Sequence, residues 1–166
     1  MRFQPLFLAV ALMAGCGGKL KRLSATEADH YYALKVWMDD DQKKTFLKYK
    51  TEEERNSYLK DQKLWDRFYA YDAATRDEIV AGEVQVGWRE DAMFMSWGNP
   101  IVRKRLTGRP AARSEMFTYR FEVDTDGIVR VWQPKSSTSY KAVAQYEIDA
   151  YVDDSVVAEL IQRDKW

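Results

Sequence analysis

Few side chains in this sequence could carry out catalysis or hold a metal ion. The chain contains one cysteine, Cys16, and one histidine, His30. A nucleophilic triad or a Cys–His pair needs such groups side by side, and a zinc site needs several of them together. Gly108 is followed by Arg and Pro, so it does not begin a phosphate-binding loop. We therefore expect no enzyme, no cofactor and no metal, with His30 as a partly exposed helix residue.

Neighbouring carboxylates are the remaining candidates for acid–base chemistry. Glu90 lies next to Asp91, and Asp153 next to Asp154. A glycosidase-like site needs two carboxyl groups that face each other across a cleft, whereas adjacent carboxylates suit helix capping and turns. The run 39–41 consists of three Asp residues but lacks the spaced ligands, Gly and final Glu of a calcium loop, so we expect it to cap a helix. A carboxylate-dependent envelope hydrolase is the less favoured alternative.

The N-terminal sequence suggests a different chemistry for the single cysteine. Arg2 precedes an apolar run over residues 6–14, which is shorter than the roughly 20 residues that cross a bilayer. Ala14 and Gly15 then place small side chains directly before Cys16. This order resembles the bacterial lipobox, in which cleavage between Gly15 and Cys16 leaves a diacylglycerol-modified cysteine at the new N-terminus. The alternative is an ordinary signal peptide with an incidental cysteine.

The lipobox resemblance implies how the chain is divided and where it resides. Residues 1–15 would be a lipoprotein signal peptide and residues 16–25 a lipidated tether. Several acyl chains on Cys16 would anchor the protein stably in a membrane. Gly17, rather than Asp, follows the cysteine, which in lipoproteins of two-membrane bacteria favours transport to the outer membrane. We expect a lipid anchor in the outer membrane of the cell envelope, with the domain facing the periplasm.

A basic segment and one tryptophan are the candidate contact surfaces. The basic side chains of this segment are Arg103, Lys104, Arg105, Arg109 and Arg113. They could contact lipid head groups or an acidic partner, although a solvated hairpin loop would have the same composition. Trp132 is expected on the exposed face of the sheet. The whole chain has 26 basic and 26 acidic residues, so no overall field attracts nucleic acid, and we expect no nucleic-acid partner.

Helix signals occupy the region from residue 26 to residue 82. Thr26 with Asp29 predicts a capping box and a helix that runs to about Met38. Thr51 with Glu54 predicts a second box, opening a helix that carries apolar residues as far as position 69. Asp72 or Thr75 would cap a further helix that ends at Gly82. These helices form the N-terminal part of the domain.

A short helix within residues 82–100 is the predicted centre of packing. Glu90 and Asp91 lie in its first turn, where carboxylates favour the positive end of the helix dipole. Most of its remaining side chains are apolar on nearly all sides, so other elements must cover it. Gly98 and Pro100 mark its end.

Alternating patterns after this helix predict an antiparallel sheet. The expected strands span residues 101–106, 116–124, 128–133, 140–152 and, as a strand or a short helix, 155–162. Asp126-Gly127 is a hairpin turn signal. The fold class is thus α+β, with N-terminal helices packed on an antiparallel meander sheet of four to five strands. Residues 26–82 and 83–166 would together form one compact domain.

Residues 79–132 resemble a known family. The acidic first turn, the apolar helix, the run Trp-Gly-Asn-Pro at 97–100, and then Glu115, Phe117 and Tyr119 resemble the SmpA/OmlA family. Its members are small outer-membrane lipoproteins of the β-barrel assembly machinery, in which helices pack on an antiparallel sheet. The resemblance implies the same fold and an envelope protein as partner.

The function expected from the sequence is therefore binding rather than catalysis. The first hypothesis is a non-catalytic outer-membrane lipoprotein that binds or scaffolds proteins in envelope assembly. The alternative is an inhibitor-like or ligand-binding periplasmic module, because the β-lactamase-inhibitor fold resembles the same helix-plus-sheet unit. An exposed, concave aromatic sheet would favour that alternative, and a covered sheet face would count against it.

Overall fold

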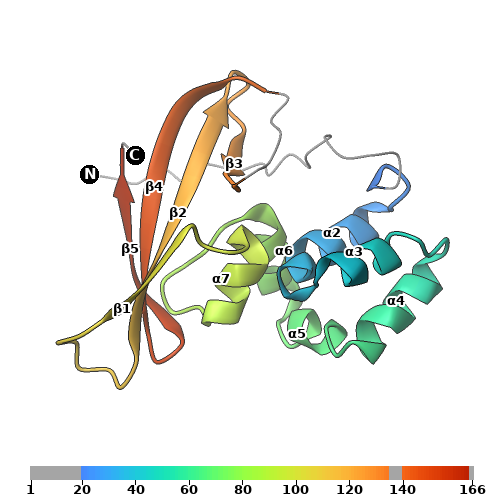
Figure 1. Cartoon of the computed structure of the whole chain (residues 1–166), viewed down its shortest axis with the longest axis horizontal. Coiled ribbons are helices and arrows are strands. Elements are labelled where there is room, and N and C mark those ends of the chain that lie inside the picture. Colours follow the sequence, from blue (N-terminus) through green and yellow to red (C-terminus); the bar gives the residue numbers. More distant parts are fainter. Residues whose placement is uncertain (1–19, 135–139, 165–166) are drawn as a thin grey trace.

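The computed structural model describes residues 20–134 and 140–164, which form helices followed by a sheet (Figure 1). This arrangement confirms the predicted α+β class. The helices of the described residues are α2 (Ala25–Leu34), the 3-10 turn η1 (Lys35–Trp37), α3 (Asp40–Phe46), α4 (Glu52–Asp61), α5 (Trp65–Tyr69), α6 (Ala73–Ala81) and α7 (Glu90–Trp97).

The sheet is antiparallel throughout and is built around one long strand. Its strands are β1 (Val102–Leu106), β2 (Ser114–Asp124), β3 (Val129–Val131), β4 (Ala142–Asp153) and β5 (Val156–Arg163). β4 pairs along one edge of β2, and β5 pairs with β4. On the other edge of β2, residues 114–118 pair with β1 and residues 121–123 pair with β3. The chain therefore passes from one edge of β2 to the other between β3 and β4.

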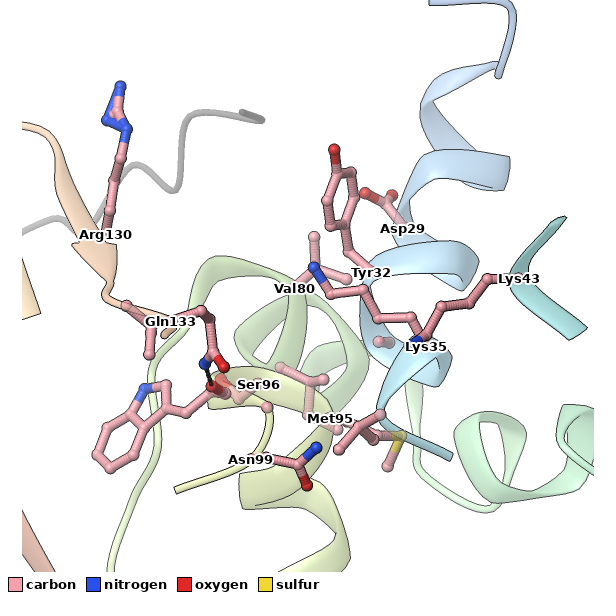
Figure 2. A pocket seen from close by; sticks show the side chains of 16 residues that line it. Asp29, Tyr32, Lys35, Lys43, Val80, Met95, Ser96, Asn99, Arg130 and Gln133 are labelled. Carbon is pink, nitrogen blue, oxygen red and sulfur yellow. Dashed lines mark hydrogen bonds between the residues drawn. The ribbon is translucent and has the colours of Figure 1, made fainter. Parts of the chain in front are cut away.

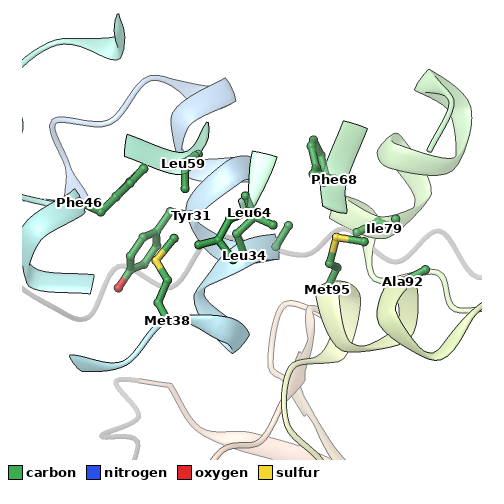
Figure 3. Close-up of a cluster of buried hydrophobic side chains, with 11 residues drawn as sticks. Tyr31, Leu34, Met38, Phe46, Leu59, Leu64, Phe68, Ile79, Ala92 and Met95 are labelled. Carbon is green, nitrogen blue, oxygen red and sulfur yellow. The ribbon is translucent and has the colours of Figure 1, made fainter. Parts of the chain in front are cut away.

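Helix α7 is shared by two buried clusters. The helical cluster includes Ala92 and Met95 of α7, which meet Phe68 and Ile79 (Figure 3). The sheet cluster includes the two other buried side chains of α7, Met93 and Trp97, together with the aromatic residues of β2. This confirms the prediction that the short helix within residues 82–100 is a centre of packing. Burial against two clusters also explains why this eight-residue helix can be apolar on nearly every side.

The other helices form a lobe beside the sheet rather than a layer on it. α7 lies against the sheet, while α2 and α6 pack on α7 (Figure 1). The side chains of Phe117, Tyr119 and Phe121 on β2 are buried beneath α7. The aromatic face of the sheet is therefore covered.

The first helix begins earlier than the sequence analysis predicted. Ser24, not Thr26, is its N-cap: the Ser24 hydroxyl accepts from the Glu27 amide, and the Glu27 carboxylate accepts from the Ser24 amide at 2.7 Å. Asp29 was the wrong partner because its shorter side chain suits this reciprocal contact less well than glutamate. The α-helix also stops at Leu34, and a 3-10 turn replaces the predicted continuation to Met38.

The second predicted helix is also divided in two. Thr51 caps α4 through a box with Glu54, as predicted, but α4 ends at Asp61 and α5 begins only at Trp65. Between them, Lys63 takes a positive φ of 55°, an uncommon conformation for a residue with a Cβ. The break lets Leu64 enter the helical cluster, so tertiary packing overrides the local pattern.

Most of the remaining cap and turn signals were correct, although β3 ends at Val131 and not at Gln133 as predicted. Asp39 caps α3 with Gln42, and Asp72 caps α6, which ends at Gly82 with a φ of 82°. The predicted turn at Asp126-Gly127 joins β2 to β3, and Gly127 has a φ of 78°. The last element is the strand β5 rather than a helix. Local capping and turn chemistry therefore defined most of the ends.

Candidate functional site

Most arginines of the predicted basic surface are paired within the chain. Arg103 donates two hydrogen bonds to the carboxylate of Glu115, at 2.8 and 2.9 Å. Arg113 donates to the same carboxylate, and Arg109 holds Asp153 through contacts of 3.0 and 2.6 Å. The hydrogen bonds from Arg103 and Arg113 lower the pKa of Glu115 to about 2. These ion pairs fasten the loop between β1 and β2 to the sheet.

Two charges of the predicted basic surface remain exposed and unpaired. Lys104 and Arg105 lie on β1, and neither makes an ion pair with the described residues. The other three basic residues are neutralised by the carboxylates of their own sheet. The surface is therefore far less positive than its sequence suggested.

Trp132 is half-buried and lies beside Arg120 on the face of the sheet opposite α7. The guanidinium of Arg120 lies 5.5 Å from the centre of its ring. Arg120 in turn donates to Glu147 at 2.9 Å, and Thr118 donates to Asp149 at 2.7 Å. This polar network belongs to the face of the sheet opposite α7. Its acidic side chains are buried but hydrogen-bonded, as buried charges generally need to be.

A pocket of about 470 Å³ lies between the helical lobe, α7 and β3. This volume lies within the roughly 300–1,000 Å³ typical of ligand sites. Its apolar lining comes from Ala33, Val36, Ile79, Val80, Met95, Trp97 and Val131. Its polar lining comes from Asp29, Tyr32, Lys35, Lys43, Ser96, Asn99, Arg130 and Gln133. Figure 2 shows the lysines on one side of this pocket and Gln133 with Arg130 on the other.

Two lysines place positive charge on the helical wall of the pocket. The ammonium of Lys35 lies 4.5 Å from the centre of the Tyr32 ring and has no carboxylate partner among the described residues. Burial, together with the positive charge of Lys43, lowers the pKa of Lys35. Lys43 contacts Asp40 at 3.3 Å, but the Asp40 side chain is largely exposed. An anionic group between these ammonium groups would relieve their repulsion.

Hydrogen-bonding side chains line the opposite wall. The Ser96 hydroxyl oxygen is buried and has no hydrogen-bond partner among the described residues. Asn99 is exposed at the rim, and Gln133 donates to the Trp97 carbonyl at a long 3.4 Å. Arg130 is directed away from the lysines, and its guanidinium contacts Asp124 at 2.9 Å (Figure 2). This wall can therefore offer donors and acceptors to a polar ligand.

Among the described residues, a single acidic side chain lines the pocket. Asp29 is its one carboxylate, and burial together with the charge of Asp77 raises the pKa of that group. A carboxylate-dependent glycosidase needs a second, facing carboxyl group, which the pocket does not supply. Among residues 20–134 and 140–164, no group of three or more His, Cys, Asp or Glu side chains is arranged to hold a metal ion.

His30 is buried, contrary to the expectation of a partly exposed residue. Only 2% of it is accessible, and its Nε2 lies 2.8 Å from the Tyr69 hydroxyl. Trp65 and Phe68 pack against the imidazole ring, while its Nδ1 has no partner among the described residues. Burial is the main cause that lowers the pKa of His30. Phe68 is buried and Tyr69 is 38% exposed, and the sequence analysis did not predict the contact of either residue with His30.

Gly15 and Cys16, the predicted cleavage and lipidation site, lie outside the described residues. Within the described part of the chain, no helix has the length and apolar character needed to cross a membrane.

The sequence analysis did not identify the pocket because its residues meet only in the fold. Lys35 and Lys43 have the sequence context of ordinary surface lysines, and Ser96 has that of a polar residue in an apolar helix. Their proximity depends on how α2, α3 and α7 pack, which no local pattern specifies.

Comparison of the chain with protein-family models, with curated proteins and with solved structures found no match.

Proposed function

We propose that this chain is a non-catalytic lipoprotein of the bacterial outer membrane that binds another envelope protein. The order of an apolar run, small residues and the single Cys16 supports the lipid anchor. The resemblance of residues 79–132 to the SmpA/OmlA family supports a role in envelope assembly.

The pocket between the helical lobe and β3 is the observation that carries the binding role. It joins an apolar floor to two lysines on one wall and to uncharged hydrogen-bonding side chains on the other. The basic loop, by contrast, is largely neutralised by Glu115 and Asp153. We therefore assign the contact surface to the pocket, with Lys104 and Arg105 as the remaining charged candidates on β1.

The inhibitor-like alternative loses the surface on which it depended. It required an open, concave aromatic sheet, whereas Phe117, Tyr119 and Phe121 are buried under α7. A carboxylate-dependent hydrolase is likewise disfavoured, because Asp29 is the one carboxylate in the pocket.

Metabolic labelling tests the anchor. Cells expressing the full chain are supplied with a radiolabelled or alkyne-bearing fatty acid, beside cells expressing Cys16→Ala. We expect label on the native chain, its recovery in the outer-membrane fraction, and loss of both in the variant. Equal labelling of the two chains would refute lipidation at Cys16.

Site-specific photocrosslinking tests the binding surface. A photoreactive phenylalanine at position 99, on the exposed rim of the pocket, is compared with one at position 53, which is exposed on α4. We expect one envelope protein of fixed size to crosslink at position 99 and not at position 53. The same product at both positions, or none at either, would contradict a specific contact at the pocket.

A further inference from the structure

Strand β3 borders the pocket with a free backbone edge. It has three residues and pairs with β2 on one side only, because no other strand pairs with it among the described residues. Arg130 and Val131 of this strand belong to the lining of the pocket. A free edge of this kind can accept a further strand from another chain.

The register of β3 shows which backbone groups this edge presents. The Trp132 amide donates to the Arg120 carbonyl at 2.8 Å, and the Asp124 amide donates to the Ile128 carbonyl at 3.0 Å. Backbone groups of successive strand residues point to alternate edges. The intervening residues Val129 and Val131 therefore direct their N–H and C=O groups away from β2. Val129 is only 4% exposed, so the accessible part of this edge is at Val131, whose outward groups have no hydrogen-bond partner among the described residues.

The charge and polarity of the walls indicate what kind of chain would pair there. Lys35 and Lys43 face this edge across the pocket, and the pocket contains one carboxylate, Asp29. An acidic side chain would be attracted to the two ammonium groups, and a basic one would be repelled. The apolar floor, with Val80 and Met95, would take alternate apolar side chains.

An acyl chain fits this pocket less well than a peptide does. Donors and acceptors lie along the wall, namely the Ser96 hydroxyl, the Asn99 amide and the edge of β3. A hydrocarbon chain would cover these groups without pairing them, which is costly, whereas a peptide backbone offers both a donor and an acceptor at each residue.

We propose that the pocket binds an extended, acidic segment of a partner protein by strand addition to β3. The segment pairs with the outward backbone groups of Val131, places apolar side chains on the floor, and presents carboxylates to Lys35 and Lys43. This mode obtains affinity from backbone hydrogen bonds and specificity from side-chain pockets. The inference rests on the proposed binding function and specifies the chemistry of its partner.

Fluorescence anisotropy with synthetic peptides tests the charge requirement. The probe is a labelled, capped eight-residue peptide that alternates valine with glutamate, and its counterpart replaces every glutamate by lysine. We expect saturable binding of the acidic peptide to the full chain, and none of the basic one. Binding that is equal for the two, or absent for both, overturns the proposal.

Substitutions on the pocket wall locate the site. Lys35→Met and Lys43→Met keep roughly the length of the side chain, and each should weaken binding about tenfold, because each removes one ammonium group that would face a carboxylate of the peptide. Lys48→Met, an exposed lysine just after α3 without an ion partner among the described residues, is the matched control and should bind normally. Unchanged thermal unfolding verifies that each variant is folded. Equal loss in the control would place the peptide elsewhere.

Backbone methylation tests strand pairing directly. In one peptide, the backbone amide of every valine is N-methylated. In a second peptide, the backbone amide of every glutamate is N-methylated instead. Because alternate amides of a strand point to opposite edges, one set should abolish binding and the other should leave at least part of it. Equal effects of the two sets would exclude pairing with β3. Displacement of the peptide by dodecanoate or by inorganic phosphate, with the same dependence on Lys35, would instead make the pocket an acyl-anion or simple anion site.

The two proposals can fail separately. If the partner crosslinks at position 99 but Lys35→Met and the methylated peptides have no effect, the binding function stands and strand addition falls. If the acidic peptide binds as expected but no envelope protein crosslinks at position 99, the pocket chemistry stands and the proposed function falls.

Discussion

Glu27 and Arg55 form the most deeply buried ion pair of the described residues, with side chains 6% and 5% exposed. The Arg55 guanidinium also donates to the Tyr49 carbonyl at 2.5 Å, and the Glu27 carboxylate accepts from the Ser24 amide. One pair therefore joins α4, the loop before it and the start of α2.

Removal of one partner should be costly. We expect Arg55→Met to lower the free energy of unfolding by about 3–5 kcal/mol, because it leaves the Glu27 charge buried without compensation. Urea denaturation measures the change. Arg89→Met removes an exposed pair with Asp91 and serves as control, with an expected change below about 1 kcal/mol. A loss for Arg55→Met as small as that of the control would contradict the structural role of the buried pair.

His30 makes stability depend on pH in a defined direction. Burial lowers the pKa of His30 in the folded state, and Arg76 lowers it further, while Glu27 opposes them. The unfolded chain has an ordinary histidine pKa of about 6.5, so it binds a proton first as the pH falls. The stabilising effect of neutral His30 is thus complete above about pH 6.5 and is lost as the pH falls from there through the folded pKa.

His30→Gln isolates this effect, because glutamine stays neutral and can still bond to the Tyr69 hydroxyl. Between pH 7 and pH 5.5 the native chain should lose more stability than the variant, by up to about 1.4 kcal/mol per pH unit. Urea unfolding at the two pH values gives the difference. Equal losses in the two proteins would mean that His30 does not titrate differently on folding.

At the scale of elements, α7 connects the helical cluster with the sheet cluster. Met95 is 3% exposed in the helical cluster, and Met93 is fully buried in the sheet cluster. Either residue changed to Ala should destabilise the protein by about 2–5 kcal/mol through lost contacts and a cavity. Because the two residues share one helix, we expect the lobe and the sheet to unfold together. In each variant, circular dichroism and tryptophan fluorescence should therefore give the same unfolding midpoint. Separate transitions would show that the lobes unfold independently.

The loop between β1 and β2 is held by the turn between β4 and β5. Arg109 binds Asp153, and the Asp154 carboxylate accepts from the Arg113 amide at 2.9 Å. We expect Asp153→Asn to release the loop and to speed proteinase K cleavage within residues 107–112 severalfold. Asp126→Asn, in the exposed β2–β3 turn, is the control and should be cleaved at the native rate. Unchanged cleavage in Asp153→Asn would mean that the loop is fixed by other contacts.

The elements that could be predicted are those whose ends depend on nearby residues. Thr51 with Glu54, Asp72 and the Asp126-Gly127 turn each act over a few positions, so the sequence located them correctly. The break at Lys63 was not predicted because it accompanies the burial of Leu64 in the helical cluster, and such packing depends on residues far away in the sequence. The pairing of Arg109 with Asp153 was missed for the same reason, since it spans 44 positions.

At the scale of the whole molecule, the fold class could be predicted but the candidate site could not. Helical and alternating patterns are strong over long segments, and the structure confirms the α+β class. The pocket lies where the lobe, α7 and β3 converge, so it depends on the relative placement of elements. Lys35 and Val131 line the same pocket although nearly a hundred positions separate them in the chain.

The chain of contacts from α2 through α7 to the sheet has a mechanical consequence. α2 and α6 contact α7, and α7 contacts β5, so tension applied at residue 20 would reach the sheet through links arranged in series. Under load, contacts arranged in series fail first where they are least stable. The two walls of the pocket belong to different elements, so a load between residue 20 and a ligand on β3 would pass across the pocket.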